Sequence, residues 1–277
     1  MGVGVTTAAG RAGLAAIVAE PSGALLAFDY DGTLAPIVAD PAKAVPHPEV
    51  VGALAELASY VGGVAVVTGR PARVAVELAA LDMVRGLEGL VVLGHYGLER
   101  WDAATGAVET VDPPPGLDKA RDDLPGLLAS LDLSGADIED KGLSVAVHVR
   151  RLADADRALE RLDGPLRQLA ADCGLMVEPG RRVIELRSSG MDKGRALRRL
   201  VEEREPRAVA FTGDDLGDLA AFAEVERLRR EGLAGLLVCS GSAEESALAE
   251  RADLVVDGPA GVVGFIKGLV AGIRQKR

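Results

Sequence analysis

Residues 25–34 read Leu-Leu-Ala-Phe-Asp-Tyr-Asp-Gly-Thr-Leu, so that four apolar residues run directly into two carboxylates one residue apart. An apolar run of this length, bounded by Gly23 and by the Asp-Gly pair, predicts a strand that is buried on both faces of a parallel sheet. Ligands of open α/β sheets bind just beyond the carboxyl ends of the strands. We therefore expect Asp29 and Asp31 at the edge of the sheet where a ligand binds.

This pair of carboxylates predicts a metal site. Two carboxylates so close together repel each other unless a cation lies between them or one of them holds a proton. Mg²⁺ suits such a place, because it is bound by one or two carboxylates together with substrate phosphate. The alternative is an ordinary Asp-Gly turn after a strand, and the rest of the chain has to decide between the two.

Short apolar runs recur along the chain and alternate with amphipathic helical segments. Helices are expected to begin at Pro48, at Pro71 and near Lys193. The runs that predict further parallel strands lie at residues 64–67, 90–93, 208–211, 236–239 and 254–256. Fully apolar strands that alternate with helices predict an α/β fold with a doubly wound parallel sheet of the Rossmann type.

The pattern changes near residue 108, where an inserted segment begins. Three consecutive prolines at 113–115 precede a helix-like stretch that ends near Ser130. Residues 143–150 then alternate between apolar and polar side chains, which predicts a half-buried strand with His148 and Arg150 on its polar side. We expect a helix and two short strands to follow, the strands at 175–178 and 182–187 joined by a turn at Pro179-Gly180. An antiparallel sheet with helices on one face results. The expected core domain is formed by residues 1–107 and 188–277, with an α+β domain inserted at 108–187.

The composition restricts the class of protein. The 277 residues are 48% hydrophobic and 26% charged, which is typical of a globular chain. Lys and Arg total 31 against 42 for Asp and Glu, and the formal charge of −11 disfavours nucleic acid or an anionic membrane as the partner. An anionic small molecule remains possible, because a local cation can outweigh the global charge.

The apolar segments of the chain favour neither a membrane span nor a signal peptide. No apolar run approaches the length that a membrane span needs. The apolar stretch at 13–19 has only Arg11 ahead of it as a basic residue and lacks a convincing cleavage site. We expect a cytoplasmic protein that is a monomer.

The polar turns that follow the predicted strands would meet at one edge of the sheet. Asp29 and Asp31 follow the first strand, Thr68-Gly69-Arg70 the second, and His95 with Glu99 the third. Asp214, Asp215 and Asp218 follow the strand at 208–211, and Lys193 begins a helix. Taken singly, each has an ordinary structural explanation, such as a helix cap or a solvated lysine. Together they supply a nucleophile, a second carboxylate, a hydroxyl, a cation and a metal site, which is what phosphoryl transfer requires.

Four motifs, in chain order, resemble the haloacid dehalogenase superfamily of phosphatases: residues 29–33, residues 68–70, Lys193, and residues 213–215 with Asp218. The resemblance implies that Asp29 is the nucleophile and receives the phosphoryl group as an aspartyl-phosphate. It implies that Asp31 protonates the leaving oxygen and later activates water. Thr68 and Lys193 are expected to hold phosphate oxygens, with Gly69 and Arg70 beside the substrate.

The same resemblance implies a Mg²⁺ cofactor. Asp29, the backbone carbonyl of Asp31 and Asp214 are the expected ligands, with Asp215 also counted at the metal site. Asp218 is expected to support the site and, with Asp215, to orient the Lys193 side chain.

The inserted domain narrows the resemblance. Its segments 139–142 (Glu-Asp-Lys-Gly), 148–150 (His-Val-Arg) and 178–180 (Glu-Pro-Gly) are similar to trehalose-6-phosphate phosphatases, whose cap domain lies between the second and third motifs. The resemblance implies that Glu139, Lys141 and Glu178 hold sugar hydroxyls, with His148 and Arg150 also at the substrate. Charged hydrogen-bonding groups suit a ligand that is almost entirely hydroxyl. A solvated charge patch is the alternative for Glu139 and Lys141.

The expected activity is therefore the Mg²⁺-dependent hydrolysis of trehalose 6-phosphate by a stand-alone phosphatase. Sucrose phosphate or a glycosyl-phosphoglycerate is the alternative substrate, and a non-catalytic sugar-phosphate-binding relative is the alternative class. Two departures from the family pattern bear on the substrate. Tyr96 stands where the family usually has His, and Gly217 and Leu219 replace a Thr and a Glu of the last motif.

Overall fold

The computed structural model describes residues 4–38, 40–180, 182–241 and 246–276. The chain divides into two compact units, the first formed by residues 1–110 and 192–277 and the second by residues 111–191. Residues 108 and 109 stay with the first unit because they form a strand of its sheet. At the other limit, the Arg187 guanidinium donates to the carbonyl oxygens of Ser188 and Met191, which keeps this linker with the second unit.

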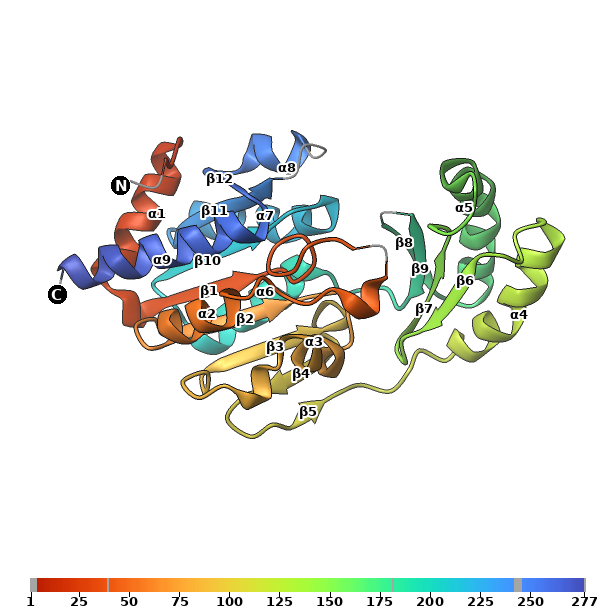
Figure 1. The fold of residues 1–277 in the computed structure, drawn as a ribbon, viewed down its shortest axis with the longest axis horizontal. Coiled ribbons are helices and arrows are strands. Elements are labelled where there is room, and N and C mark those ends of the chain that lie inside the picture. The colour runs from red at the N-terminus through yellow and green to blue at the C-terminus, as the bar shows by residue number, and fades with distance from the viewer. Residues whose placement is uncertain (1–3, 39, 181, 242–245, 277) are drawn as a thin grey trace. The chain divides into compact units, whose positions relative to one another are not determined.

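The first unit is built on an eight-stranded sheet with the order β12-β11-β10-β1-β2-β3-β4-β5 (Figure 1). Its strands are β1 Ala24–Phe28, β2 Gly63–Val67, β3 Leu90–Gly94, β4 Glu99–Asp102, β5 Val108–Glu109, β10 Ala208–Gly213, β11 Ala234–Gly241 and β12 Leu254–Asp257. The strands from β12 to β3 pair in parallel, which confirms the predicted sheet. The antiparallel strands β4 and β5, which continue the sheet beyond β3, were not predicted. In β4 only Trp101 is buried, so the apolar pattern of a strand is weak there.

Helices cover both faces of this sheet. One face packs against α1 Ala8–Ala19, α2 Val50–Ala58, α3 Ala72–Ala79 and α9 Gly258–Lys276. The other face packs against α6 Lys193–Arg204 and α7 Leu219–Arg230, where Phe222 makes an edge contact with Phe211 of β10. The remaining short elements are α8 Ser246–Arg251 and the 3₁₀ turns η1 Pro21–Gly23, η2 Pro41–Lys43, η3 Leu81–Met83, η4 His95–Gly97 and η5 Leu216–Asp218.

The apolar stretch at 13–19 is part of α1, which lies directly on the sheet. A side chain at Gly13 would come within 1.9 Å of the Gly235 carbonyl oxygen, so the helix approaches the start of β11 as closely as a glycine allows. Ile17 of the same helix is fully buried. In the described part of the chain, no helix combines the length and the apolar character that crossing a membrane requires.

The second unit is a four-stranded antiparallel sheet with two helices on one face (Figure 1). Its elements are α4 Leu117–Ser130, β6 Asp137–Asp140, β7 Ser144–His148, α5 Ala155–Asp172, β8 Met176–Gly180 and β9 Val183–Arg187, with the strand order β6-β7-β9-β8. Val145 and Val147 of β7 point toward the helices and join a core with Leu124 and Leu162.

The turn predicted at Pro179-Gly180 is wrong. Both residues belong to β8, where they pair with Ile184 and Val183 of β9. The strand lies at the edge of its sheet, and a proline there needs no amide hydrogen for the ladder.

Candidate functional site

The candidate site is built on three neighbouring strand ends of the parallel sheet. Strand β1 lies between β2 and β10, and Asp29, Thr68 and Asp214 directly follow these three strands. The amide of Asp29 donates to the Thr212 carbonyl over 2.8 Å, which ties the loop after β1 to β10. All three functional side chains are buried.

Lys193 supplies the positive charge of this cluster. Its Nζ lies 2.6 Å from Oδ1 of Asp29 and 2.7 Å from Oδ1 of Asp218, and all three side chains are almost wholly buried. The lysine begins α6, and the preceding Asp192 accepts the Arg195 amide to cap the helix. Burial alone would lower the pKa of Lys193, but the nearby carboxylates of Asp218 and Asp29 outweigh burial and raise it, so the side chain is a fixed cation.

Both carboxylate oxygens of Asp218 accept hydrogen bonds from protein groups, so the side chain supports the site. One of its oxygens faces Lys193, and the other accepts the amides of Asp214 and Asp215 over 2.8 and 3.2 Å. Asp215 itself is exposed, and its carboxylate accepts the amide of Gly217 at the start of η5. The structure therefore gives Asp215 the role of a turn cap, and its side chain is not part of the acidic cluster formed by the described residues.

Asp29, Asp214 and Asp218 each bring one carboxylate oxygen to a common place, where these atoms lie within 4.8 Å of one another. Oδ1 of Asp214 is buried and accepts no hydrogen bond from the described residues. Burial and the neighbouring carboxylate of Asp29 raise the pKa of Asp214 to about 10. Burial likewise raises the pKa of Asp29, and Lys193 opposes this only in part.

This arrangement fits a divalent cation. Mg²⁺, which is bound by oxygen ligands, would give the unpartnered Asp214 oxygen a partner. It would also offset the repulsion between the Asp214 and Asp29 carboxylates. The donor set is all oxygen, which also suits Mg²⁺.

The loop after β1 can approach Asp214 only because residue 32 is glycine. Gly32 has a φ of +75°, and a Cβ atom there would come within 1.8 Å of Oδ2 of Asp214. The Ser240 hydroxyl, at the end of β11, donates to the Gly32 carbonyl over 2.7 Å and holds the loop in place. Ser240 was missed in the sequence, where a polar residue after the apolar run at 236–239 was the available signal.

The Asp31 side chain does not join the acidic cluster. Arg70 donates from Nε and Nη2 to the two Asp31 oxygens, over 2.7 and 2.6 Å, and from Nη1 to the Pro41 carbonyl over 2.9 Å. Arg70 is expected from the sequence beside the substrate, whereas in the structure its guanidinium contacts Asp31.

The loop 94–99 clamps the second motif. Thr68 and Arg70 accept the amides of Tyr96 and His95 through their carbonyl oxygens, each over 2.9 Å. Glu99 accepts the Ala72 amide over 2.7 Å at the start of α3. His95 and Tyr96 both have a positive φ, of 47° and 59°, a conformation that is uncommon for non-glycine residues.

Tyr96 covers Gly69. A Cβ atom on Gly69 would lie 2.7 Å from the Tyr96 hydroxyl oxygen, so the phenol occupies the space above the motif loop. Tyr96 is one of the positions at which the sequence departs from the resembled family.

The second unit gathers charged side chains on the face of its sheet that is opposite α4 and α5. Glu139, Glu185 and Glu178 lie in one row across β6, β9 and β8. Three short contacts order this face: a hydrogen bond between Glu139 and His148 at 2.7 Å, and the ion pairs of Lys141 with Glu185 and of Glu178 with Arg187, both at 2.6 Å. Arg150 follows β7 and is half-buried.

Glu185 is an acidic residue of this face that was not expected from the sequence. Only 5% of it is exposed, and its Oε1 is buried without a hydrogen-bond partner among the described residues. Its signal was a charged residue within the alternating segment 183–187, where Ile184 and Leu186 point to the core.

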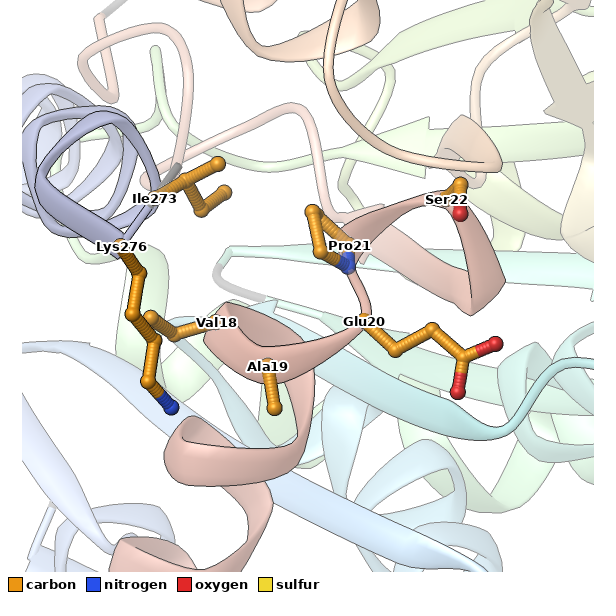
Figure 2. A pocket seen from close by; sticks show the side chains of 7 residues that line it. All are labelled: Val18, Ala19, Glu20, Pro21, Ser22, Ile273 and Lys276. Carbon is orange, nitrogen blue, oxygen red and sulfur yellow. The ribbon is translucent and has the colours of Figure 1, made fainter.

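A separate hollow of about 280 Å³ lies between the end of α1 and the end of α9 (Figure 2). Its lining includes Val18, Pro21 and Ile273, with Glu20 and Lys276 as its charged residues. No residue of its lining belongs to the motifs, so the hollow is not part of the candidate site.

Comparison with known proteins gives consistent results. The family described as trehalose-phosphatase matches residues 27–256. A trehalose-phosphate phosphatase from Mycobacterium marinum is 32% identical over 253 residues, which cover 86% of this chain and 59% of that protein. A trehalose-6-phosphate phosphatase from Escherichia coli is 29% identical over 256 residues, covering 90% of this chain and 88% of that protein. This chain therefore spans about three-fifths of the mycobacterial relative.

Solved structures share the fold. The C-terminal domain of C. albicans trehalose-6-phosphate phosphatase superimposes with a TM-score of 0.77 at 22% identity, over 96% of this chain and 97% of that domain. A haloacid dehalogenase-like hydrolase from Bacteroides thetaiotaomicron gives a TM-score of 0.62 at 15% identity, over 88% of this chain and 98% of that one.

Proposed function

The chain belongs to the trehalose-phosphatase family, and on that premise we propose that it hydrolyses trehalose 6-phosphate to trehalose and phosphate. The observation that carries the proposal is the buried cluster in which Lys193 lies within 2.7 Å of Asp29 and Asp218, beside the orphaned oxygen of Asp214. A nucleophile, a fixed cation and a place for a divalent ion are thereby held together at the end of one sheet. Charge neutralisation and positioning supply most of the catalysis in phosphoryl transfer.

The first chemical step forms an aspartyl-phosphate. A carboxylate oxygen of Asp29 attacks phosphorus and forms a new P–O bond, while the bond between phosphorus and the sugar oxygen breaks and its electron pair stays on that oxygen. The carboxyl of Asp31 gives its proton to this oxygen, so that trehalose leaves as the neutral alcohol and Asp31 becomes a carboxylate.

The second step hydrolyses the aspartyl-phosphate, and Asp31 now acts as a base. Water attacks phosphorus and passes a proton to the Asp31 carboxylate, the P–O bond to Asp29 breaks, and Asp29 is regenerated as a carboxylate with the release of phosphate. Lys193 stays paired with Asp29 in both steps and offsets the negative charge of the transferred phosphoryl group. The Thr68 hydroxyl is a further contact of the phosphate.

Mg²⁺ is the proposed cofactor, held by Asp29 and Asp214 with the carbonyl oxygen of Asp31. When bound, it neutralises negative charge on the phosphoryl oxygens. Asp218 holds Lys193 and the amides after β10, and so keeps Asp214 in place.

The second unit is proposed to recognise the sugar. Its charged face offers carboxylates and a lysine in fixed orientations, among them Glu139, Lys141 and Glu185. Charge-assisted hydrogen bonds to sugar hydroxyls are strong and directional, which suits them to selecting one disaccharide. Glu178, which pairs with Arg187, is a further candidate on the same face.

The test is phosphate release from a panel of sugar phosphates by the purified chain with Mg²⁺. The panel contains trehalose 6-phosphate, sucrose 6-phosphate, a glucosyl-phosphoglycerate and glucose 6-phosphate, and Asp29→Asn is the inactive control. We expect kcat/KM for trehalose 6-phosphate to exceed that of every other ester. A higher kcat/KM for sucrose 6-phosphate or the glucosyl-phosphoglycerate would make that ester the substrate instead. If the wild-type chain released no more phosphate than Asp29→Asn, the proposed activity would be refuted.

A further inference from the structure

We propose that Arg70 is a positioning residue that orients the Asp31 carboxyl group, rather than a ligand of the substrate phosphate. The proposal rests on the proposed function, because there Asp31 is the acid and base of the reaction. It differs from the expectation drawn from the sequence, which placed Arg70 at the substrate.

The contacts of the guanidinium group support this role. Nε and Nη2 reach the two Asp31 oxygens over 2.7 and 2.6 Å, in the parallel two-bond arrangement that fixes a carboxylate most firmly. Nη1 donates to the Pro41 carbonyl over 2.9 Å, and the guanidinium carbon lies 5.4 Å from the centre of the Tyr30 ring. Each of the three guanidinium nitrogens therefore donates a hydrogen bond to a protein oxygen.

The arginine is anchored at its backbone as well. Its amide donates to the Thr68 hydroxyl oxygen over 3.1 Å, and its carbonyl accepts the amide of His95 over 2.9 Å. Both contacts come from segments that flank the site, so the base of the side chain is as well defined as its end.

Exposure explains why Asp31 needs such a partner. Its side chain is 39% exposed, whereas that of Arg70 is 12% exposed. A carboxyl on a loop with one side open to water would rotate among several orientations, and proton transfer tolerates little misplacement. The less exposed arginine therefore holds the more exposed carboxyl in one orientation.

This contact is compatible with both forms of the acid. The carboxylate offers two acceptor oxygens and takes both donors of Arg70. The protonated carboxyl keeps one acceptor oxygen for the arginine and has its O–H for the leaving oxygen. Arg70 can therefore orient Asp31 in both steps without contacting the phosphoryl group.

The experiment uses aryl phosphates, because they carry no sugar and differ in how much their leaving group needs a proton. The leaving group of phenyl phosphate is a basic phenolate, which needs a proton as it departs. The leaving group of 2,4-dinitrophenyl phosphate is weakly basic and departs without protonation. The burst of phenol in the first turnover reports formation of the aspartyl-phosphate alone. The variants are Arg70→Gln, Arg70→Lys, Asp31→Asn and the double variant Asp31→Asn with Arg70→Gln. Arg73→Gln is the matched control, since Arg73 is exposed and donates to the Gly106 carbonyl at 3.3 Å.

We expect Arg70→Gln to slow the burst with phenyl phosphate on the order of 100-fold, and the burst with 2,4-dinitrophenyl phosphate by less than about 10-fold, since general acid catalysis is worth about 10²–10⁴ in rate. KM changes by less than about threefold on both. Arg70→Lys behaves like Arg70→Gln, because a single ammonium cannot hold both carboxyl oxygens. In the Asp31→Asn background Arg70→Gln costs nothing further, as expected of residues that act as a unit. Arg73→Gln matches the wild type.

Equal losses on the two esters with a raised KM would show that Arg70 binds phosphate and would overturn the proposal. Full activity of Arg70→Lys, or additive losses in the double variant, would overturn it as well. A chain that hydrolyses the aryl esters but not trehalose 6-phosphate fails the proposed function, and the comparison of leaving groups still decides the role of Arg70.

Discussion

Lys193 Nζ lies 2.6 Å from Asp29 Oδ1, with 6% of the lysine side chain and 5% of the aspartate side chain exposed. A carboxylate buried in this way is costly unless a cation accompanies it. The lysine therefore does two things at once: it keeps the proposed nucleophile inside the protein, and it places a positive charge where phosphoryl oxygens arrive.

Lys193→Met is expected to reduce both stability and activity. It leaves Asp29 and Asp218 buried without their cation, and breaking a buried pair typically costs about 3–5 kcal/mol. We expect urea unfolding to show a loss of this order and kcat to fall at least about 100-fold. Lys267→Met is the matched control, because the Lys267–Glu49 pair is exposed and such pairs contribute about 1 kcal/mol or less. Equal stability of the two variants would contradict the assignment.

Asp29→Asn is expected to abolish phosphate release while the fold is retained. The amide has nearly the same shape but cannot attack phosphorus. Circular dichroism should match the wild type, and no phosphorylated protein should form when the variant is mixed with substrate and quenched in acid. More than a few per cent of wild-type turnover would show that another group is the nucleophile.

Mg²⁺ is expected to stabilise the protein more as the pH rises. The pKa of Asp214 is raised to about 10 in the folded chain, mainly by burial, against an ordinary value near 3.8. In the metal-free protein the Asp214 carboxyl contributes stability to the fold that is fully present below its unfolded pKa of 3.8. This contribution is lost as the pH rises from that value toward about 10. With chelator, Tm should therefore fall between pH 5 and 8, and added Mg²⁺ should raise Tm more at pH 8. In Asp214→Asn the Mg²⁺ effect should be small at both pH values, and a large effect there would refute the site.

Glu185→Gln is expected to lower kcat/KM for trehalose 6-phosphate by roughly 10- to 100-fold, since a hydrogen bond from a charged group is worth about 1.5–3 kcal/mol. Hydrolysis of 4-nitrophenyl phosphate should change little, because that ester has no sugar to hold. Glu160→Gln is the control, an exposed glutamate on α5, which packs on the other face of the sheet. Equal losses on both esters would mean that Glu185 serves the fold rather than the substrate.

Gly32→Ala is expected to destabilise the chain and to reduce activity strongly. Its Cβ atom would fall 1.8 Å from the Asp214 carboxylate, and its φ of +75° is unfavourable for alanine. Gly52→Ala is the matched control, because Gly52 lies within α2 with open space around its Cβ, and the same change should stabilise the helix by up to about 1 kcal/mol. Thermal melts and phosphate release measure both effects, and a Gly32→Ala protein that behaves like Gly52→Ala would contradict the close approach.

Much of the fold could be predicted from short-range patterns. The strands β1, β2 and β3 carry no polar side chain, and β10 is apolar up to Thr212, so a few consecutive positions indicate their burial on both faces. The parallel sheet followed from them. The antiparallel strand β4, which lies between β3 and β5, and the last two residues of the edge strand β8 were not predicted, because a polar or proline-containing segment joins a sheet through the partner that it pairs with and not through an apolar pattern of its own.

The candidate site divides in the same way. The sequence by itself determined which chemical groups follow which strands, since Asp29 and Thr68 come directly after apolar runs and Asp214 follows the run 208–211 after Thr212 and Gly213. Only the tertiary structure decided how those groups are partnered. Arg70 turned out to hold Asp31, 39 residues away, and Glu185 emerged as a buried acid opposite Lys141. Local patterns specify elements through the hydrogen bonding and burial of neighbouring residues, whereas the pairing of charges depends on which segments the folded sheets bring within a few ångströms of each other.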